Sequence, residues 1–359
     1  MNNNNDRAWA ATRKGLIELR RSGDAWRPVR TSFLAEPVSM VLPPAPGRPM
    51  LAALNLGHFG VKVHASDDEG ATWREVACPT FPEQPKDAEG PAWKLVQIWE
   101  LEAAGGTLWC GTLPGGLFRS DDGAASWQLV DSLWHHPARL EWAGGGYAEP
   151  GIHSICPHPA RPGELLLAIS TGGAWLTRDD GASWANQSDG MRACYMPPEQ
   201  AGDPNAQDAH RVQRCAAVPD VLWCQHHCGI WRSSDNAASW QELKATPSSF
   251  GFAVAAHPTD PLTAWFAPAI KDEKRVPVDQ ALCVTRTRDG GQTFEALRQG
   301  LPQQDCYDLV YRHGLAVGGD GRTLLMGSTT GGVWSSADAG DSWQMVPARL
   351  GPVYALRFG

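Results

Sequence analysis

Three histidines and one glutamate are the residues of this 359-residue chain whose types best suit chemistry at a single site. His58, His153 and His227 are far apart in the sequence, but three imidazoles around one opening could hold Zn, Fe or Cu with a position left open for substrate. Glu100 is the candidate general base, with His153 and His227 as its catalytic partners. The alternative is that each histidine only bonds a neighbouring backbone carbonyl, since the chain has no short His-Glu-x-x-His motif.

Cationic and aromatic side chains provide a second kind of candidate site, one that binds a small anion. The predicted ligand-binding residues are His58, Lys62, Trp99, Gln225, Lys271 and Arg275. Within a protein of net charge −8, the lysines and the arginine could form a positive funnel for a carboxylate, a phosphate or an acidic sugar. The alternative is an ordinary solvated rim of surface charge.

These residues can meet only if distant segments share one opening, and a repeat in the sequence predicts such a fold. The segment Thr177-Arg-Asp-Asp-Gly-Ala-Ser-Trp184 is one of seven related copies. The other copies end at Trp26, Trp73, Trp127, Trp240, Phe294 and Trp343. The steps between these aromatic residues are 47, 54, 57, 56, 54 and 49 residues, the length of a four-stranded propeller blade. The Asp of each copy can bond backbone N–H groups in its own turn, so we interpret it as structural.

The pattern Ser/Thr-x-Asp-x-Gly-x-Ser/Thr-Trp resembles the Asp-box, or BNR repeat, of sialidases, xyloglucanase-type glycosidases, sortilin-like receptors and photosystem II assembly factors. The resemblance covers almost the whole chain and implies a β-propeller, whereas these families share little function. True sialidase activity is not expected. The chain has no Arg-Ile-Pro motif, and its seven copies exceed the six blades typical of sialidases.

We therefore predict an all-β fold, a seven-bladed β-propeller with Asp-box turns. One domain is expected over residues 8–359, after a flexible N-terminal segment over residues 1–7. Residues 8–19 match the second and third strands of a blade, and residues 352–358 match a first strand. The C-terminal strand should thus complete blade 1 and leave no free sheet edge. Other first strands are predicted at 38–42, 98–101, 152–156, 212–216, 252–256 and 307–311.

This strand order also predicts where the candidate residues lie. If the repeated Asp turns occupy one face of the ring, the turns between second and third strands and the starts of first strands lie on the opposite face, around the channel mouth. All the candidate site residues belong to these segments. Two long connections, 133–151 and 187–211, are expected to flank the mouth as lids.

Composition narrows the classes of partner and compartment. A net charge of −8 offers no general attraction for nucleic acid or an anionic membrane, and no stretch resembles a transmembrane span. The first residues lack the basic and apolar regions of a secretory signal, which predicts a cytoplasmic protein. The nine cysteines, mostly in apolar strand-like runs, are predicted to be small buried side chains and not disulfides. The oligomeric state is left open.

The sequence favours a small-ligand-binding, hydrolase-like protein that acts on an anionic or carbohydrate-like molecule at the channel mouth. One alternative is a metal-dependent enzyme with a divalent transition metal, the only cofactor predicted, at His58, His153 and His227. The other alternative is a non-enzymatic scaffold whose rim binds a protein partner, as the photosystem assembly factors do.

Overall fold

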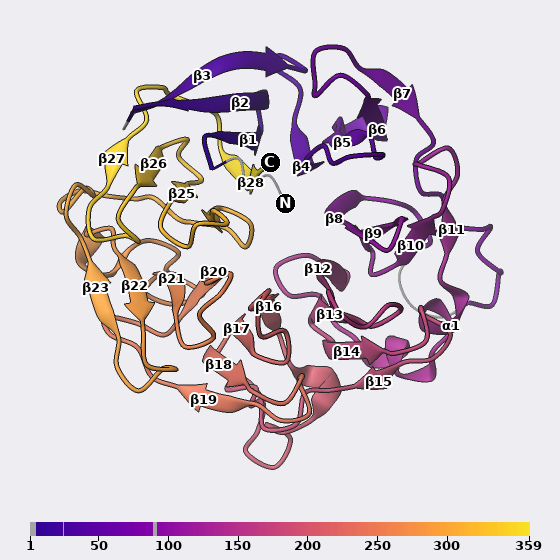
Figure 1. Cartoon of the computed structure of the whole chain (residues 1–359). Helices are drawn as coiled ribbons and strands as arrows, with labels where there is room; N and C mark the ends of the chain where they lie inside the picture. The colour runs from indigo at the N-terminus through magenta and orange to yellow at the C-terminus, as the bar shows by residue number, and fades with distance from the viewer. Residues whose placement is uncertain (1–4, 24, 89–91) are drawn as a thin grey trace.

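Seven four-stranded antiparallel sheets are arranged around a central channel in the computed structural model, which describes residues 5–23, 25–88 and 92–359 (Figure 1). The predicted seven-bladed β-propeller is confirmed. Apolar residues between neighbouring blades form the core. Between blades 5 and 6, for example, Trp223, Leu243 and Phe266 pack in one buried cluster.

Blade 1 is built from both ends of the chain, as predicted. Strand β28 (Val353–Phe358) pairs with β1 (Arg7–Thr12), and β2 (Gly15–Ser22) and β3 (Ala25–Ser32) complete the sheet. Figure 1 shows the C-terminal strand β28 beside β1, near the channel. Of the segment expected to be flexible, residues 1–4 lie outside the described residues, and β1 already begins at Arg7.

The other blades are formed by consecutive strands of the chain. Blade 2 contains β4 (Val38–Leu42), β5 (Met50–Asn55), β6 (Val61–Ser66) and β7 (Arg74–Val76). Blade 3 contains β8 (Gln97–Ala104), β9 (Thr107–Leu113), β10 (Leu117–Ser120) and β11 (Gln128–Leu129). Blade 4 contains β12 (Gly151–Pro157), β13 (Leu165–Ser170), β14 (Gly173–Thr177) and β15 (Ala185–Asn186).

The second half of the ring repeats this arrangement. Blade 5 contains β16 (Ala209–Arg214), β17 (Leu222–His226), β18 (Gly229–Ser233) and β19 (Gln241–Leu243). Blade 6 contains β20 (Gly251–Ala256), β21 (Ala264–Pro268), β22 (Val284–Thr287) and β23 (Glu295–Leu297). Blade 7 contains β24 (Leu315–Val317), β25 (Leu324–Gly327), β26 (Val333–Ser336) and β27 (Gln344–Met345).

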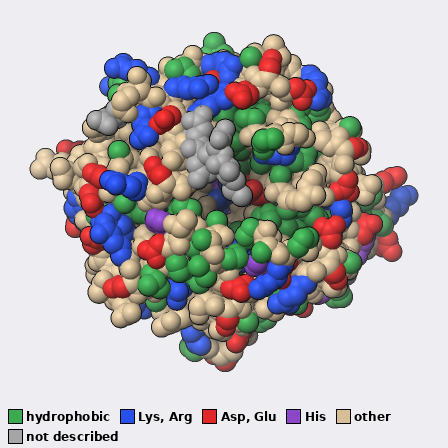
Figure 2. Space-filling model, in the orientation of Figure 1, with side chains coloured by type: hydrophobic (Ala, Val, Ile, Leu, Met, Phe, Trp, Pro, Cys, Tyr) green, Lys and Arg blue, Asp and Glu red, His purple; other side chains and the backbone are tan. Residues whose placement is uncertain are grey.

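Helical segments are short and lie in connections. They are α1 (Asp131–Trp134), η1 (Gly57–Phe59), η2 (Pro137–Glu141), η3 (Pro204–Ala206) and η4 (Val278–Gln280). Among the described residues, no helix has the length and hydrophobicity needed to cross a lipid bilayer. In the view of Figure 2, acidic and basic side chains are interspersed around the disc, and pairs such as Arg30–Glu18, at 2.6 Å, join them.

The first strand of blade 7 was predicted at 307–311, and this prediction is wrong. The structure begins that strand, β24, at Leu315. Residues 307–311 are held by side-chain hydrogen bonds in place of a strand ladder: the Asp308 carboxylate accepts hydrogen bonds from the hydroxyls of Ser328 and Thr330 in the β25–β26 turn. The segment that follows, from Tyr311 to His313, therefore runs along the channel mouth.

The repeated Asp residues organise their turns through one hydrogen-bond pattern, for which Asp179 serves as the example. Its carboxylate accepts hydrogen bonds from Thr177 Oγ1 at 2.7 Å, Ser183 N at 2.8 Å and Ser183 Oγ at 2.5 Å. The same pattern recurs at Asp68, Asp122, Asp235, Asp289 and Asp338. We call these six turns the Asp turns.

The Trp that closes an Asp turn joins its blade to the preceding one. Trp127 Nε1 in blade 3 donates to the carbonyl of Ala77, 3.0 Å away, where the chain leaves blade 2. Trp240 Nε1 in blade 5 likewise donates to the carbonyl of Gln187 at 2.8 Å, where the chain leaves blade 4. The indole also buries a large apolar area. The Asp turn therefore holds neighbouring blades together in addition to fixing the backbone conformation of the turn itself.

A buried charged group closes the channel beneath its mouth. The carboxylate of Glu100, which is 1% exposed, pairs with Arg357, with Arg211 at 3.4 Å and with His313 at 3.5 Å. We call these four residues the Glu100 cluster. Burial raises the pKa of Glu100 to about 7, against the opposing effect of Arg357 and Arg211. The cluster forms a floor between the mouth and a lower cavity of about 430 Å³.

Replacement of Asp68 should destabilise the protein, because the Ser66 and Thr72 hydroxyls and the Thr72 amide would lose their acceptor. We expect Asp68→Ala to lower Tm by about 2 °C or more at pH 7 in calorimetry. Asp67→Ala is the matched control, since among the described residues exposed Asp67 pairs with Arg74 alone, at 3.3 Å. Equal effects of the two variants would contradict this account of the turn.

The difference in Tm between the parent protein and Asp68→Ala should also disappear in acid. These hydrogen bonds lower the pKa of Asp68 from 3.8 to about 2, and Thr72 makes the largest contribution. Stability from the ionised carboxylate is therefore present above pH 3.8 and lost as the pH falls through 2. The Tm values of the parent protein and Asp68→Ala should approach each other over that range.

Glu100 should make stability depend on pH near neutrality. The unfolded chain releases the Glu100 proton near pH 4.5, whereas burial raises the folded pKa to about 7. The stability gained from the protonated form is thus complete below pH 4.5 and lost as the pH rises through 7, by roughly 3 kcal/mol in total. Urea unfolding of Glu100→Gln, which cannot titrate, should show a smaller fall over this range. An unchanged slope would show that Glu100 does not titrate there.

Candidate functional site

A cavity of about 980 Å³ lies at the channel mouth, on the face opposite the Asp turns. We call it the mouth cavity. Its wall is formed by turns between second and third strands, by starts of first strands and by long connections. These are the segments that the strand order predicts for this face.

Bulges in the innermost strands direct side chains toward this cavity. Among the described strands, the innermost strand of six blades carries one extra residue relative to its partner, near the mouth. The residues at these bulges are Ser39, Trp99, His153, His210, Phe252 and Tyr354. All but His153 line the mouth cavity. A bulge breaks the strict alternation of a strand and re-aims one side chain, so the repeated bulge supplies one wall residue from five of these six blades.

Two long connections complete the wall. Residues 144–147, between β11 and β12, and Cys194 with Tyr195, between β15 and β16, both line the mouth cavity. Ser170 Oγ donates to the carbonyl of Gly145 at 3.1 Å. A Cβ atom at Gly145 would lie 2.9 Å from Asp208 Oδ2, so the close approach of this loop to Asp208 needs a glycine.

The cysteine prediction is wrong at two positions. Cys194 and Cys228 form a disulfide, with their Cα atoms 5.7 Å apart. Cys194 lies in a long connection and not in a strand, and the connection folds back over the β17–β18 turn, a contact that the sequence does not indicate. The disulfide ties this connection to the turn that carries His227. The seven other cysteines are free and buried or partly buried.

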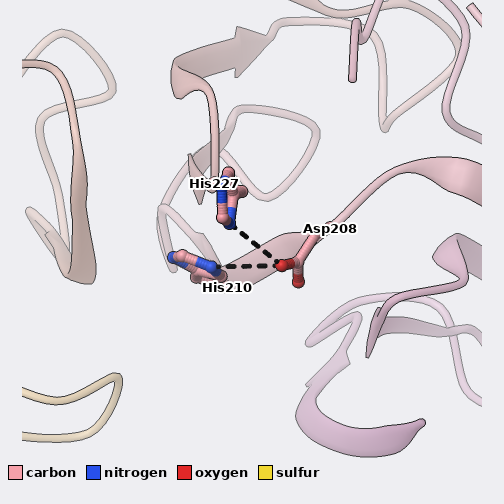
Figure 3. Close-up of side chains that lie close together, drawn as sticks. All are labelled: Asp208, His210 and His227. Carbon is pink, nitrogen blue, oxygen red and sulfur yellow. Dashed lines mark ion pairs between the residues drawn. The ribbon is translucent and has the colours of Figure 1, made fainter. Parts of the chain in front are cut away.

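Asp208, His210 and His227 converge on the cavity wall (Figure 3), and we call them the Asp208 cluster. Asp208 Oδ2 lies 3.3 Å from His210 Nε2 and 3.4 Å from His227 Nδ1. The side chains of Asp208 and His210 are 5% and 2% exposed, and that of His227 is 22% exposed. Figure 3 shows both imidazole rings directed at the carboxylate. In the described part of the chain, this is the one set of three His, Cys, Asp or Glu side chains whose ligand atoms all lie within 4.8 Å of one another.

Burial and charge act in opposite directions on the Asp208 cluster. Burial opposes ionisation of Asp208, but His210, His227 and Arg312 outweigh it and hold the Asp208 pKa well below its usual range. Burial lowers the pKa of His210, which Asp208 opposes. Asp208 is therefore a carboxylate in the folded protein, and its Oδ1 atom is buried without a hydrogen-bond partner among the described residues.

Arg312 is a buried cation on the same wall. Its guanidinium lies 4.9 Å from the ring centroid of Trp99 and 5.4 Å from that of Phe252. The residue is 7% exposed, and burial lowers its pKa to about 10. Within the described ranges it makes no ion pair within 4.0 Å, and its guanidinium donates a hydrogen bond of 3.4 Å to Ser170 Oγ. It therefore stays positively charged at neutral pH without a bonded carboxylate.

Four of the predicted site residues line the mouth cavity: Trp99, His227, Lys271 and Arg275. Lys271 and Arg275 already have partners there, since Lys271 pairs with Glu273 at 3.2 Å and Arg275 pairs with Asp272 at 2.5 Å.

The structure places the other predicted residues elsewhere. Glu100 lies in the Glu100 cluster, because the bulge at Trp99 turns the next side chain into the channel. His153 is fully buried, 5.3 Å from Trp99 between ring centroids, and burial holds its pKa well below normal. Gln225 Nε2 donates to three backbone carbonyls of the surrounding turns.

His58 and Lys62 also lie outside the cavity wall. His58 is exposed in η1, and Lys62 on β6 pairs with Glu75 at 2.6 Å. Of the three histidines predicted to bind metal, only His227 belongs to the Asp208 cluster.

Sequence reasoning did not identify Asp208, His210 and Arg312 as site residues. Asp208 and His210 fell inside the connection 187–211 because the first strand of blade 5 was expected to start at residue 212. Arg312 followed a segment wrongly expected to be a strand. No local signal marks these positions, because the residues before the bulges, Ile98, Ile152 and Ala209, are ordinary apolar strand residues.

Solved structures resemble this fold at low sequence identity. No protein-family model and no curated protein matches the chain. A Bacteroides fragilis protein assigned as a candidate 6-phosphogluconolactonase is similar at a TM-score of 0.60 and 13% identity, over 100% of this chain and 99% of that one. YCF48 from Cyanidioschyzon merolae has a TM-score of 0.56 and 14% identity, over 94% and 91%.

An ancestral GH74 enzyme is similar at a TM-score of 0.55 and 14% identity over 83% of this chain, which spans 36% of that enzyme. At these identities the likenesses establish the β-propeller fold alone.

Proposed function

We propose that the protein binds a small molecule carrying an anionic group and a ring or sugar unit in the mouth cavity, and hydrolyses it there. The observation that carries the proposal is Arg312. A buried cation without a bonded counter-ion is costly, and a guanidinium held between Trp99 and Phe252 is preorganised to pair with a carboxylate or phosphate. The anion of the ligand would supply the missing partner.

The aromatic wall supports a ligand with a ring. The aromatic residues on the cavity wall are Trp99, Tyr147, Tyr195, Phe250, Phe252, Tyr311 and Tyr354. Trp99 and Tyr147 meet edge to face, with ring centroids 5.2 Å apart. Flat apolar faces edged by hydroxyl groups suit the alternating apolar and polar surfaces of a sugar or a substituted ring.

The Asp208 cluster supports hydrolysis as the reaction. A carboxylate and two imidazoles within hydrogen-bond reach can orient a water molecule and take up its proton. The partly exposed His227 gives the cluster access to the cavity that contains Arg312. An ester, lactone or glycosidic bond of a ligand anchored at Arg312 would lie within the same enclosed space.

The enclosure of the cavity favours a small ligand over a protein partner. Residues 144–147 and Cys194 with Tyr195 wall the mouth, whereas a protein partner needs a broad accessible surface. We also infer from the Asp turns that the chain is a BNR/Asp-box repeat protein. The recurrence of one hydrogen-bond pattern in six turns supports this inference.

Anion binding can be tested with Arg312→Gln. We expect at least one of glucuronate, gluconate, benzoate and inorganic phosphate to raise the Tm of the parent protein, because binding to the folded state stabilises it. Arg312→Gln should lose this rise. Arg322→Gln, which changes an exposed arginine of the same blade, should keep it. If no probe raises the Tm of the parent protein, or if both variants behave alike, the anion site is not at Arg312.

Hydrolysis can be tested with a panel of lactones and nitrophenyl esters and glycosides. His227→Gln should lower kcat for an accepted substrate by about 100-fold or more, the usual size of a lost acid–base group. His58→Gln is the control, since His58 is exposed outside the cavity. If His227→Gln keeps its turnover, the reaction does not depend on the Asp208 cluster.

A further inference from the structure

The hydrogen bonds of His210 leave two acceptor atoms facing each other. His210 Nδ1 lies 2.7 Å from the carbonyl oxygen of Gly251. A carbonyl can only accept, so Nδ1 carries the hydrogen, and Nε2 of the neutral ring presents a lone pair. That lone pair faces Asp208 Oδ2 at 3.3 Å. A positive centre between the two atoms, either a proton or a metal ion, is needed to make this contact favourable.

A second imidazole converges on the same oxygen. His227 Nδ1 lies 3.4 Å from Asp208 Oδ2, and all three ligand atoms lie within 4.8 Å of one another. One metal ion can serve both contacts, whereas without a metal His210 needs an added proton and His227 must carry its hydrogen on Nδ1 to donate to Asp208. We infer that Asp208, His210 and His227 bind a divalent transition-metal ion such as Zn²⁺ at the wall of the mouth cavity.

Two of the three spacings between the ligand atoms fit such an ion, and the third, between His210 and His227, is at most 4.8 Å. Metal–ligand bonds of about 2.1 Å at tetrahedral or octahedral angles separate neighbouring ligand atoms by roughly 3.0–3.4 Å. The two separations from Asp208 Oδ2, 3.3 and 3.4 Å, match this range. Two imidazoles and one carboxylate suit zinc and iron better than magnesium or calcium, which prefer oxygen ligands.

Neighbouring groups hold the three ligands in place. The carbonyl of Gly251 fixes the His210 tautomer, which is the usual role of a second partner of a metal-binding histidine. The Cys194–Cys228 disulfide ties down the residue next to His227. Asp208 Oδ1, buried and without a partner among the described residues, is free to take up a second position on the ion.

The ion would define how the cavity hydrolyses its ligand, and this part of the inference rests on the proposed function. A water molecule on such an ion loses a proton near neutral pH. The oxygen of that water would then bond to the electrophilic carbon of an ester or lactone as the bond from that carbon to the leaving oxygen breaks, and the leaving oxygen would take up a proton from solvent, to which the water had released its own. Asp208, His210 and His227 would in this case hold the ion and would not themselves take up the proton. Arg312 would hold the anionic end of the ligand during this step.

Calorimetric titration of ZnCl₂ into the full chain, dialysed first against a chelator, tests the site. We expect the parent protein to bind about one equivalent of Zn²⁺. His227→Ala should weaken binding by about 100-fold or more, since it removes a ligand, and it should fold because His227 is partly exposed on a turn. Asp208→Asn should have a similar effect while keeping the shape of the side chain.

His58→Ala is the matched control. His58 lies on the same face of the ring but outside the Asp208 cluster, so this variant should bind Zn²⁺ like the parent protein. Two results would overturn the inference. Absence of Zn²⁺ binding by the parent protein would mean that a proton, and not a metal, lies between His210 and Asp208. Equal loss in His58→Ala and His227→Ala would place the metal at another set of histidines.

The two proposals can fail separately. Glucuronate binding is measured on protein that has been dialysed against a chelator. It depends on Arg312, which is not a member of the Asp208 cluster. Anion binding without Zn²⁺ binding would overturn only the metal site. Zn²⁺ binding with no response to any anionic probe would leave the metal site in place and overturn the proposed ligand.

Discussion

The candidate site depends on a one-residue bulge near the mouth end of the innermost strands. In a regular strand, side chains alternate strictly between the two faces of the sheet. Without a bulge, only every second side chain of an innermost strand would therefore lie on a given face of its blade. The bulge breaks the alternation and places Trp99, His210 and Phe252 in one cavity wall. The same displacement sends Glu100 down the channel, where it meets Arg211 and Arg357. One backbone feature thus places some side chains on the wall of the mouth cavity and others in the Glu100 cluster beneath it.

The two levels differ in how their charges are balanced. In the floor, the carboxylate of Glu100 meets two arginines, so its charge is balanced within the cluster, although Arg211 Nε and Arg357 Nε are buried without a hydrogen-bond partner among the described residues. In the wall, Arg312 has no bonded carboxylate among the described residues, and Asp208 keeps one oxygen without a partner. A ligand or an ion that enters the cavity can pair with a buried charge that has no bonded partner, or with a buried oxygen that accepts no hydrogen bond. This contrast is why the site is assigned to the wall and not to the more heavily charged floor.

The sequence predicts the fold well because the Asp turn is a local feature. Its Asp, its hydroxyl residue and its closing Trp lie within eight residues, so the period and the blade order can be found without knowledge of distant contacts. The bulge cannot be found in the same way, because a shift of one residue reverses which face each side chain takes. Glu100 was therefore expected at the mouth, and His210 was not considered. The Cys194–Cys228 disulfide and the position of Arg312 depend on how long connections fold back, which no local pattern records.

The site lies where the repeat is least regular. Across the ring the bulge position holds residues as different as Ser39, His153 and Tyr354, so the backbone repeats while the chemistry does not. The long connections on either side of blade 4 bring in Gly145, which approaches Asp208, and Cys194, which ties down the turn of His227. A closed ring of similar blades can tolerate such insertions because the Trp of the Asp turn joins each of blades 2 to 5 to the preceding blade. The Asp turns therefore connect blades on the regular face, and this leaves the irregular face free to hold buried groups that only a ligand or an ion would complete.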